Sequence, residues 1–239
     1  MLNIVTALKI EAKPIIKHFG LKSNKGIYQN GYINLIITGS GKIKSAINTS
    51  LLLSKYPYKT LNIGIAGSDK HEINEGFFIH KISDYDSGLE YYPDYFEENS
   101  SEITCISKIG KYFELVDMES SGFFEACYKF LSVEEIILYK IVSDTPETKP
   151  KTDLIPELIK NHISVIEKLI EQKEDFFKDI NEYLEFAASK IRLTQTQKNQ
   201  LKQILVFYKI KQIPFPAIPD LKRKEDVREF LSSLTSSFF

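Results

Sequence analysis

The sequence has few of the features that define disulfide-rich, metal-binding or polyanion-binding proteins. Its 239 residues include two cysteines, Cys105 and Cys127, with no C-x-x-C spacing and no nearby histidine, so neither a disulfide scaffold nor a structural zinc site is expected. The 31 Lys and Arg residues balance 32 Asp and Glu residues, which leaves no bulk charge to attract nucleic acid or anionic lipid. No stretch approaches the roughly 18 uncharged apolar residues of a membrane helix. We therefore expect a soluble, cytoplasmic protein with no metal, cofactor, nucleic-acid or membrane partner.

Short apolar runs rich in β-branched residues alternate with segments of helical spacing along most of the chain. Continuous rather than alternating hydrophobicity is typical of strands that are covered on both faces. We expect helices after Lys42 and over 119–130, and strands over 2–7, 33–38, 61–65, 77–82, 103–107, 113–116 and 136–142. This order predicts an α/β fold, which we expect to be a three-layer αβα arrangement with a central mixed β-sheet.

The pattern becomes helical after residue 153. A long helix is expected over 156–188, and a second begins at Thr194, whose spacing from Gln197 allows a capping box. A Pro-rich break at 213–219 precedes a last helix over 224–234. We place the boundary near residue 185, between an α/β domain (1–185) and a helical C-terminal extension (186–239). The extension, with its apolar end at 236–239, is expected to pad the domain or cover an interface.

Four segments place a glycine or a carboxylate where a strand gives way to a turn, which is where ligands bind in α/β sheets. They are residues 7–11 (A-L-K-I-E), 38–42 (T-G-S-G-K), 62–67 (N-I-G-I-A-G), and the pair 117–119 (D-M-E) and 142–144 (V-S-D). Singly, each also fits an ordinary turn or a carboxylate at a helix start. As a set, Glu11, Glu119 and Asp144 would converge at one end of the sheet, where their mutual repulsion must be offset by some function.

In order and approximate spacing, these segments resemble motifs of the purine nucleosidase and phosphorylase superfamily. They are most similar to its 5'-methylthioadenosine/S-adenosylhomocysteine nucleosidase and futalosine hydrolase branches. The similarity pairs 7–11 with A-x-x-x-E, 38–42 with S-G-x-G-K, 62–67 with N-x-G-x-A-G, 116–120 with V-E-M-E-A and 142–144 with I-S-D. It covers residues 1 to about 170, and it implies a phosphorylase/hydrolase-like fold, a small-molecule purine nucleoside as ligand, and a homodimer.

The resemblance also implies roles for individual residues. Glu11 would hold the attacking water, and Asp144 would act as the acid at the purine. Glu119 would bind the ribose hydroxyls, Met118 would pack on the sugar, and Ser143 would support the base-binding loop. The remaining expected substrate-binding residues are Gly41, Ile65, Gly67 and Ile106.

The chemistry of a glycosidic C–N bond calls for such a set independently of the family. A purine leaves badly as an anion, so one carboxyl must be held protonated, which is the task given to Asp144. A second carboxylate, Glu11, accepts a proton from water on the opposite face of the sugar. A third orients the ribose and faces the developing cation. Glu119 is the candidate for that role, and Asp117 is a less favoured substitute.

Water is favoured over phosphate as the attacking group. Phosphorolysis needs a dianion held beside the sugar, usually by arginines, and no arginine precedes Arg192. Lys9 and Lys42 are more simply solvated or paired. Two alternatives stay open: a purine nucleoside phosphorylase, and a catalytically weak nucleoside-binding protein that uses its helical tail for a partner. The presence of all three carboxylates argues against the second.

The segment 86–112 is shorter than its counterpart in the family, where this region supplies backbone and an aromatic residue to the purine. Ile106 and Ser107 are the suggested replacements. The run 89–96 (L-E-Y-Y-P-D-Y-F) is either an aromatic lid or surface packing. Ile65 stands where methylthioadenosine enzymes usually carry serine, and this is closer to the futalosine branch. The sequence therefore leaves the nucleoside open.

Overall fold

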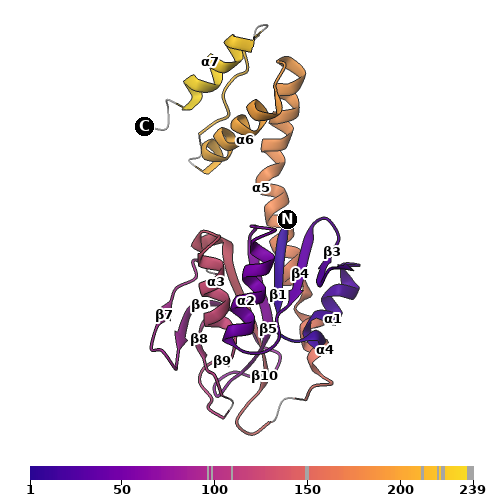
Figure 1. The fold of residues 1–239 in the computed structure, drawn as a ribbon, viewed down its shortest axis with the longest axis vertical. Helices are drawn as coiled ribbons and strands as arrows, with labels where there is room; N and C mark the ends of the chain where they lie inside the picture. Colours follow the sequence, from indigo (N-terminus) through magenta and orange to yellow (C-terminus); the bar gives the residue numbers. More distant parts are fainter. Residues whose placement is uncertain are drawn as a thin grey trace. The chain divides into compact units, whose positions relative to one another are not determined.

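The computed structural model describes residues 1–95, 97, 99–108, 110–148, 151–210, 213–219, 221 and 224–235. The chain divides into two units, Met1–Lys168 and Leu169–Phe239 (Figure 1). The domain boundary expected near residue 185 lies inside helix α5 (Ile163–Lys190), which begins in the first unit and continues into the second.

The first unit is built on one mixed sheet. Its order is β10-β6-β8-β9-β5-β1-β4-β3-β2, with β7 paired to β6 and β10 also paired to β5, so β5, β10, β6, β8 and β9 close into a ring. Parallel pairs such as β1–β5 and β10–β5 stand beside antiparallel pairs such as β10–β6 and β5–β9, as expected for a mixed sheet. The strands are β1 (Leu2–Thr6), β2 (Lys22–Asn24), β3 (Ile27–Gln29), β4 (Ile33–Ile37), β5 (Thr60–Gly67), β6 (Gly76–Asp84), β7 (Glu90–Tyr91), β8 (Ser100–Cys105), β9 (Val116–Asp117) and β10 (Ile136–Asp144).

Helices cover both faces of this sheet. Every residue of β1 and all but the last of β10 are buried, which a strand achieves only when both of its faces are packed. Helices α1 and α4 pack against each other, as do α2 and α3, and the two pairs flank the sheet (Figure 1). The α/β fold expected from the sequence is thereby confirmed. The helices are α1 (Lys9–His18), α2 (Lys42–Leu53), α3 (Ser120–Tyr128) and α4 (Ile155–Asn161), with a 3-10 turn at Val133–Glu135.

Two expected elements are wrong in detail. The strand expected over 113–116 is limited to β9, because residues before it bond instead to the turn after β5: Asp69 N–H donates to the Phe113 carbonyl and Ser68 Oγ to that of Glu114. The single helix expected over 156–188 is interrupted at His162, which separates α4 from α5. The His162 ring is held by Tyr139 Oη at 2.8 Å and by the Asn74 carbonyl at 3.0 Å.

The second unit packs the later part of α5 with α6 (Gln195–Ile210) and α7 (Lys224–Thr235). The capping box at the start of α6 is confirmed, since Thr194 N–H donates to Gln197 Oε1 at 2.9 Å and Gln197 N–H to Thr194 Oγ1 at 3.3 Å. The apolar end at 236–239 lies outside the described residues. Among the described helices, none has the length and apolarity to cross a membrane. The core of this unit contains Ile180, Ala187, Ile191, Leu201, Ile204, Leu205, Tyr208, Val227, Leu231 and Leu234.

Candidate active site

A pocket of about 170 Å³ lies at the carboxyl ends of β5 and β10, beside the turn after β1. All three acids expected to converge line it. Gly41 is not among the lining residues, but its backbone N–H bonds to Glu119. The expected residues that line the pocket are Glu11, Ile65, Gly67, Ile106, Met118, Glu119, Ser143 and Asp144.

Glu11 enters the pocket from the first turn of α1. It is 2% exposed, and its carboxylate accepts two backbone N–H bonds, from Leu8 at 2.7 Å and from Ile65 at 3.0 Å. Burial raises the pKa of Glu11 to about 7, although these two donors and the Lys140 ammonium lower it. Near neutral pH this carboxyl therefore exists in both protonation states, as a group that exchanges a proton with water requires.

Gly64 makes the position of Glu11 possible. A Cβ at residue 64 would lie 2.9 Å from Glu11 Oε1, closer than real Cβ atoms approach an oxygen. A Cβ here would push the carboxylate away from β5, so glycine leaves the room in which Glu11 reaches the Ile65 N–H. This gives a structural reason for the first glycine of the N-I-G-I-A-G segment.

Glu119 lies between β9 and α3, 8% exposed, and faces the turn before α2. Its Oε1 accepts the Gly41 N–H at 2.6 Å and the Ser40 hydroxyl at 2.9 Å. Burial raises the pKa of Glu119, and the nearby Asp117 carboxylate raises it further, while Lys140 and the two donors lower it. The glycine turn at 38–42 thus serves to orient this acid.

A buried lysine stands among the carboxylates. Lys140, in the middle of β10, has a side chain 2% exposed and lies 2.8 Å from Asp117 Oδ2. Burial alone lowers the pKa of Lys140, but Asp117, Glu119 and Glu11 together raise it above its ordinary value. The ammonium therefore stays charged and offsets part of the repulsion among the three acids.

The Asp117 carboxylate is occupied by structural contacts within the protein. Besides its ion pair with Lys140, it accepts the Ser120 hydroxyl at 2.7 Å and the Ser120 N–H at 3.1 Å, which satisfies the start of α3. The geometry therefore favours Glu119 over Asp117 as the acid that faces a ligand.

Asp144 ends β10 and lines the pocket. Its Oδ1 accepts the Ser143 hydroxyl at 2.6 Å, and its Oδ2 accepts the Tyr112 hydroxyl at 2.9 Å. Tyr112 comes from the segment between β8 and β9. Burial and the bond to Asp144 both raise the pKa of Tyr112, so its hydroxyl remains a neutral donor.

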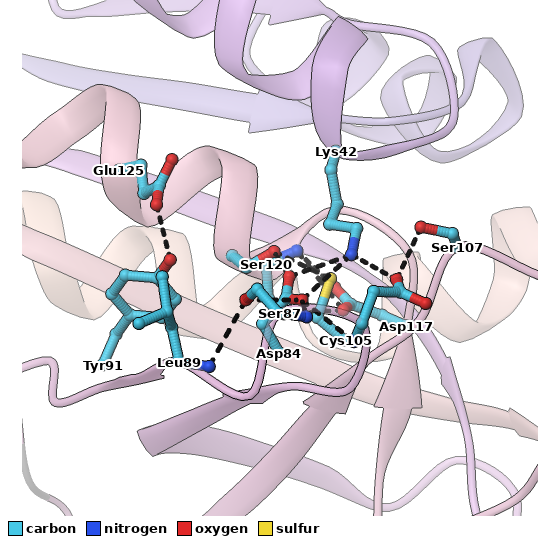
Figure 2. A network of polar contacts seen from close by, with 12 residues as sticks. Lys42, Asp84, Ser87, Leu89, Tyr91, Cys105, Ser107, Asp117, Ser120 and Glu125 are labelled. Atoms are coloured by element: carbon cyan, nitrogen blue, oxygen red, sulfur yellow. Dashed lines mark hydrogen bonds and ion pairs between the residues drawn. The ribbon is translucent and has the colours of Figure 1, made fainter.

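A second polar cluster holds the loops beside the pocket (Figure 2). Lys42 points at Asp84, with Nζ 3.1 and 3.0 Å from the two carboxylate oxygens, and also bonds to Asp86, which accepts the Ser107 hydroxyl at 2.6 Å. Although burial raises the pKa of Asp84, donors from Ser121, Ser87 and Lys42 hold it well below its usual range. Lys42 is thus paired outside the pocket, as the simpler reading of the sequence expected.

The aromatic run at 89–96 contributes no described residue to the pocket lining. Tyr91 packs against Phe124 and donates to Glu125, and Tyr95 packs against Phe78. Phe96 lies outside the described residues. The contacts of the described part of this run therefore favour the packing interpretation over the lid interpretation.

Three residues of the site were not expected from the sequence. Ser40 lies within a recognised motif, and a hydroxyl beside a glycine turn is its only signal. Lys140 lies in a strand whose other residues are mostly apolar, and the sequence analysis did not single it out. A lysine at a fully buried strand position nevertheless indicates that an acidic side chain pairs with it. Tyr112 lies in a loop whose path no local pattern fixes. Among the described residues, no group of His, Cys, Asp or Glu is arranged to hold a metal ion.

The fold is that of the 5'-methylthioadenosine/S-adenosylhomocysteine nucleosidases and of futalosine hydrolase. The structure matches the nucleosidase of Campylobacter jejuni with a TM-score of 0.62 at 15% identity, over 72% of this chain and 98% of that one. It matches a futalosine hydrolase mutant of Helicobacter pylori strain 26695 with a TM-score of 0.61 at 16% identity, again over 72% and 98%. The resemblance of fold expected from the five motifs is confirmed.

Similarity in sequence points to the same proteins over a shorter stretch. The chain is 38% identical over 58 residues to the 5'-methylthioadenosine/S-adenosylhomocysteine nucleosidase of Bacillus cereus (strain B4264), which is 24% of this chain and 25% of that protein. With the protein of the same name from Bacillus cytotoxicus it shares 35% identity over 69 residues, 28% of this chain and 30% of that protein. The chain thus spans between a quarter and a third of the length of these relatives. No protein-family model matches it.

Proposed function

We propose that this chain is an enzyme that hydrolyses the N-glycosidic bond of a purine nucleoside, of the 5'-methylthioadenosine/S-adenosylhomocysteine or futalosine type. The observation that carries the proposal is the convergence of Glu11, Glu119 and Asp144 on one pocket of a nucleosidase fold. Binding alone would not need three buried or half-buried acids at one place, because each costs free energy to hold there.

In the proposed reaction, Glu11 is the general base. As the water oxygen bonds to the anomeric carbon, a water proton passes to the Glu11 carboxylate. Its two backbone donors fix the carboxylate plane, and its pKa of about 7 matches the proton affinity that a base needs near neutral pH.

Asp144 is the proposed acid at the opposite end of the sugar. The C–N bond breaks with its electron pair going to the purine, and a ring nitrogen takes the Asp144 proton, so the base leaves neutral. The Ser143 hydroxyl, 2.6 Å from Oδ1, supports this role because it restricts rotation of the carboxyl group.

Glu119 is proposed to bind the ribose hydroxyls. Both of its hydrogen bonds, from Ser40 and Gly41, reach Oε1, so Oε2 can accept from the ligand. Its negative charge would then face the cation that develops on the sugar. Met118 lines the same side of the pocket and suits an apolar contact with the ring.

Pairing of the nearby lysines supports water rather than phosphate as the attacking group. Lys42 is bonded to Asp84 and Asp86, and Lys140 to Asp117, so neither of these two ammonium groups is free to hold a phosphate dianion. Lys111, which lines the pocket, instead donates to the Tyr85 hydroxyl and lies over the Tyr85 ring. A purine nucleoside phosphorylase and a catalytically weak nucleoside-binding protein remain the alternatives that the experiment must separate.

The test is to incubate the protein with methylthioadenosine, adenosylhomocysteine, futalosine, adenosine and inosine, with and without phosphate, and to measure free base by chromatography. Release that does not depend on phosphate is the expected result. Release that occurs only with phosphate would show that the enzyme is a phosphorylase. Binding without release would show that the protein binds nucleosides but does not cleave them.

We also propose a homodimer, as the resemblance implies. Helix α2 supports this assembly because it exposes an apolar stripe at i, i+4 and i+8: Ile43 is 76% exposed, Ile47 62% and Leu51 47%. Sedimentation velocity should give a dimer for the wild type and a monomer for Ile47→Glu. A monomeric wild type would end this proposal.

A cytoplasmic location is proposed on the basis of the cysteines. Both are free and buried, and burial raises the pKa of Cys105 to about 12, which keeps it a thiol. Cell fractionation tests this location, and recovery of the protein outside the cytoplasmic fraction would contradict it.

A further inference from the structure

The pocket is small for the ligand that it is proposed to hold. Its volume is about 170 Å³, whereas small-molecule sites typically measure about 300 Å³ or more. Glu11 and Glu119 are each held by two hydrogen bonds, Glu11 from the Leu8 and Ile65 N–H groups and Glu119 from Ser40 and Gly41. The residues that restrict the pocket and could move must therefore lie on its loop side, where Gly110, Lys111 and Tyr112 line it.

Tyr112 lies in the part of the pocket that contains Asp144 and Gly67. A Cβ built on Gly67 would meet Tyr112 Cε1 at 3.0 Å and Asp144 Oδ2 at 3.2 Å, so the phenol ring and the carboxylate converge over the Gly67 backbone. Its hydroxyl donates to Asp144 Oδ2 at 2.9 Å. In the proposed function, a purine has to reach the same carboxylate and pass over the same glycine.

The segment that carries Tyr112 is held by hydrogen bonds at both ends. Ser107 bonds to Asp86 on one side, and on the other side the Phe113 and Glu114 carbonyls accept bonds from the turn after β5. Between these points, Lys111 lies over the Tyr85 ring at 4.0 Å and donates to its hydroxyl, and Tyr112 bonds to Asp144. Among the described residues, a shift of 110–112 would break the contact of Lys111 with Tyr85 and the hydrogen bond of Tyr112 to Asp144.

We propose that Tyr112 competes with the purine base for Asp144. Its hydroxyl stays bonded to Asp144 until a purine displaces it, and residues 110–112 then move aside and enlarge the pocket. The inference rests on the proposed function, since Asp144 is the group for which the base and the tyrosine compete. The apparent affinity for the base is then reduced by the fraction of molecules in which Tyr112 is in place.

Calorimetric titration with free adenine and free hypoxanthine tests this competition without turnover. Tyr112→Phe keeps the ring and removes only the hydroxyl that donates to Asp144 Oδ2, so the Kd for the preferred base should fall about tenfold. Tyr92→Phe is the matched control, because Tyr92 also donates to a carboxylate, Glu90 Oε2, at 2.5 Å, but lies exposed outside the pocket. Its Kd should equal that of the wild type.

A Kd that is unchanged or higher in Tyr112→Phe, while the wild type binds the base, would overturn the competition and leave the proposed function standing. Failure of the proposed function is seen separately, as no base release by the wild type from any nucleoside. Amide hydrogen exchange then decides the contact: peptides covering 110–115 should exchange faster in Tyr112→Phe than in Tyr92→Phe. Equal exchange would overturn the inference.

Discussion

Glu11 shows how the fold sets the chemistry of a single side chain. The first turn of α1 directs it inward, and Gly64 leaves the space for its carboxylate. Burial raises its pKa while the Leu8 and Ile65 N–H groups limit the rise, so the pKa settles at about 7. An acid in this environment is balanced between its two protonation states at the pH of most cells.

The protonation of Glu11 predicts a pH dependence of hydrolysis. A base must be deprotonated, so kcat/KM should show an ascending limb as pH rises through about 7. Glu11→Gln should lose on the order of 100-fold in kcat/KM and lose this ascending limb. Glu157→Gln, in the first turn of α4 and exposed, serves as the control. A rate in Glu11→Gln equal to that of the control would remove Glu11 from the mechanism.

At the scale of elements, one ion pair connects β10 to the junction of β9 and α3. Lys140 comes from the middle of β10, and Asp117 at the end of β9 also satisfies the first turn of α3. Because both side chains are nearly inaccessible, at 2% and 1% exposure, neither charge can be hydrated if its partner is removed. The pair thus fixes the strand that ends in Asp144 against the segment that carries Glu119.

Replacing Lys140 should therefore destabilise the first unit. Lys140→Met leaves Asp117 buried without a counter-charge and should lower the free energy of unfolding by about 3–5 kcal/mol, measured by urea denaturation. The double variant Lys140→Met/Asp117→Asn removes both charges and should regain at least half of this loss. A loss below about 1 kcal/mol in the single variant would show that the pair is hydrated in solution.

The elements that sequence analysis predicted well are those with a strong local pattern. Strands β1, β4, β5 and β10 follow from continuous apolar runs, and the three acids follow from their places at strand and helix ends. The sequence did not predict β2, β3 or β7, which are short, or the interruption at His162, which depends on Tyr139 and Asn74 far away in the chain. Tyr112 was missed for the same reason, because its partner Asp144 is brought near only by the tertiary fold.

At the scale of the whole molecule, each of the two units has a core of its own among the described residues. One lies on the sheet of the first unit, and the other holds α6 and α7 with the later part of α5. Every pocket residue belongs to the first unit. We therefore expect a substitution in the core of the second unit to change the stability of that unit without changing the rate of base release.

A core variant of the second unit tests this separation. Leu231 is 1% exposed, and Leu231→Ala should destabilise the second unit by about 2–5 kcal/mol, seen as an earlier step in thermal unfolding followed by circular dichroism. Base release should stay within about twofold of the wild-type rate. Leu231→Met, which conserves volume, should leave the melt nearly unchanged. Loss of activity in Leu231→Ala with the first unit still folded would show that the two units work together.

The central claim is that Asp144 acts with Glu11 and Glu119 on one bound nucleoside. Its most direct test is the initial rate of base release in phosphate-free buffer by the wild type, Asp144→Asn and the exposed control Asp153→Asn, all checked for an unchanged melting temperature. We predict that Asp144→Asn falls by a factor on the order of 100 or more, while the control matches the wild type. Equal rates in all three proteins, or no base release by the wild type from any nucleoside in the panel, would contradict the claim.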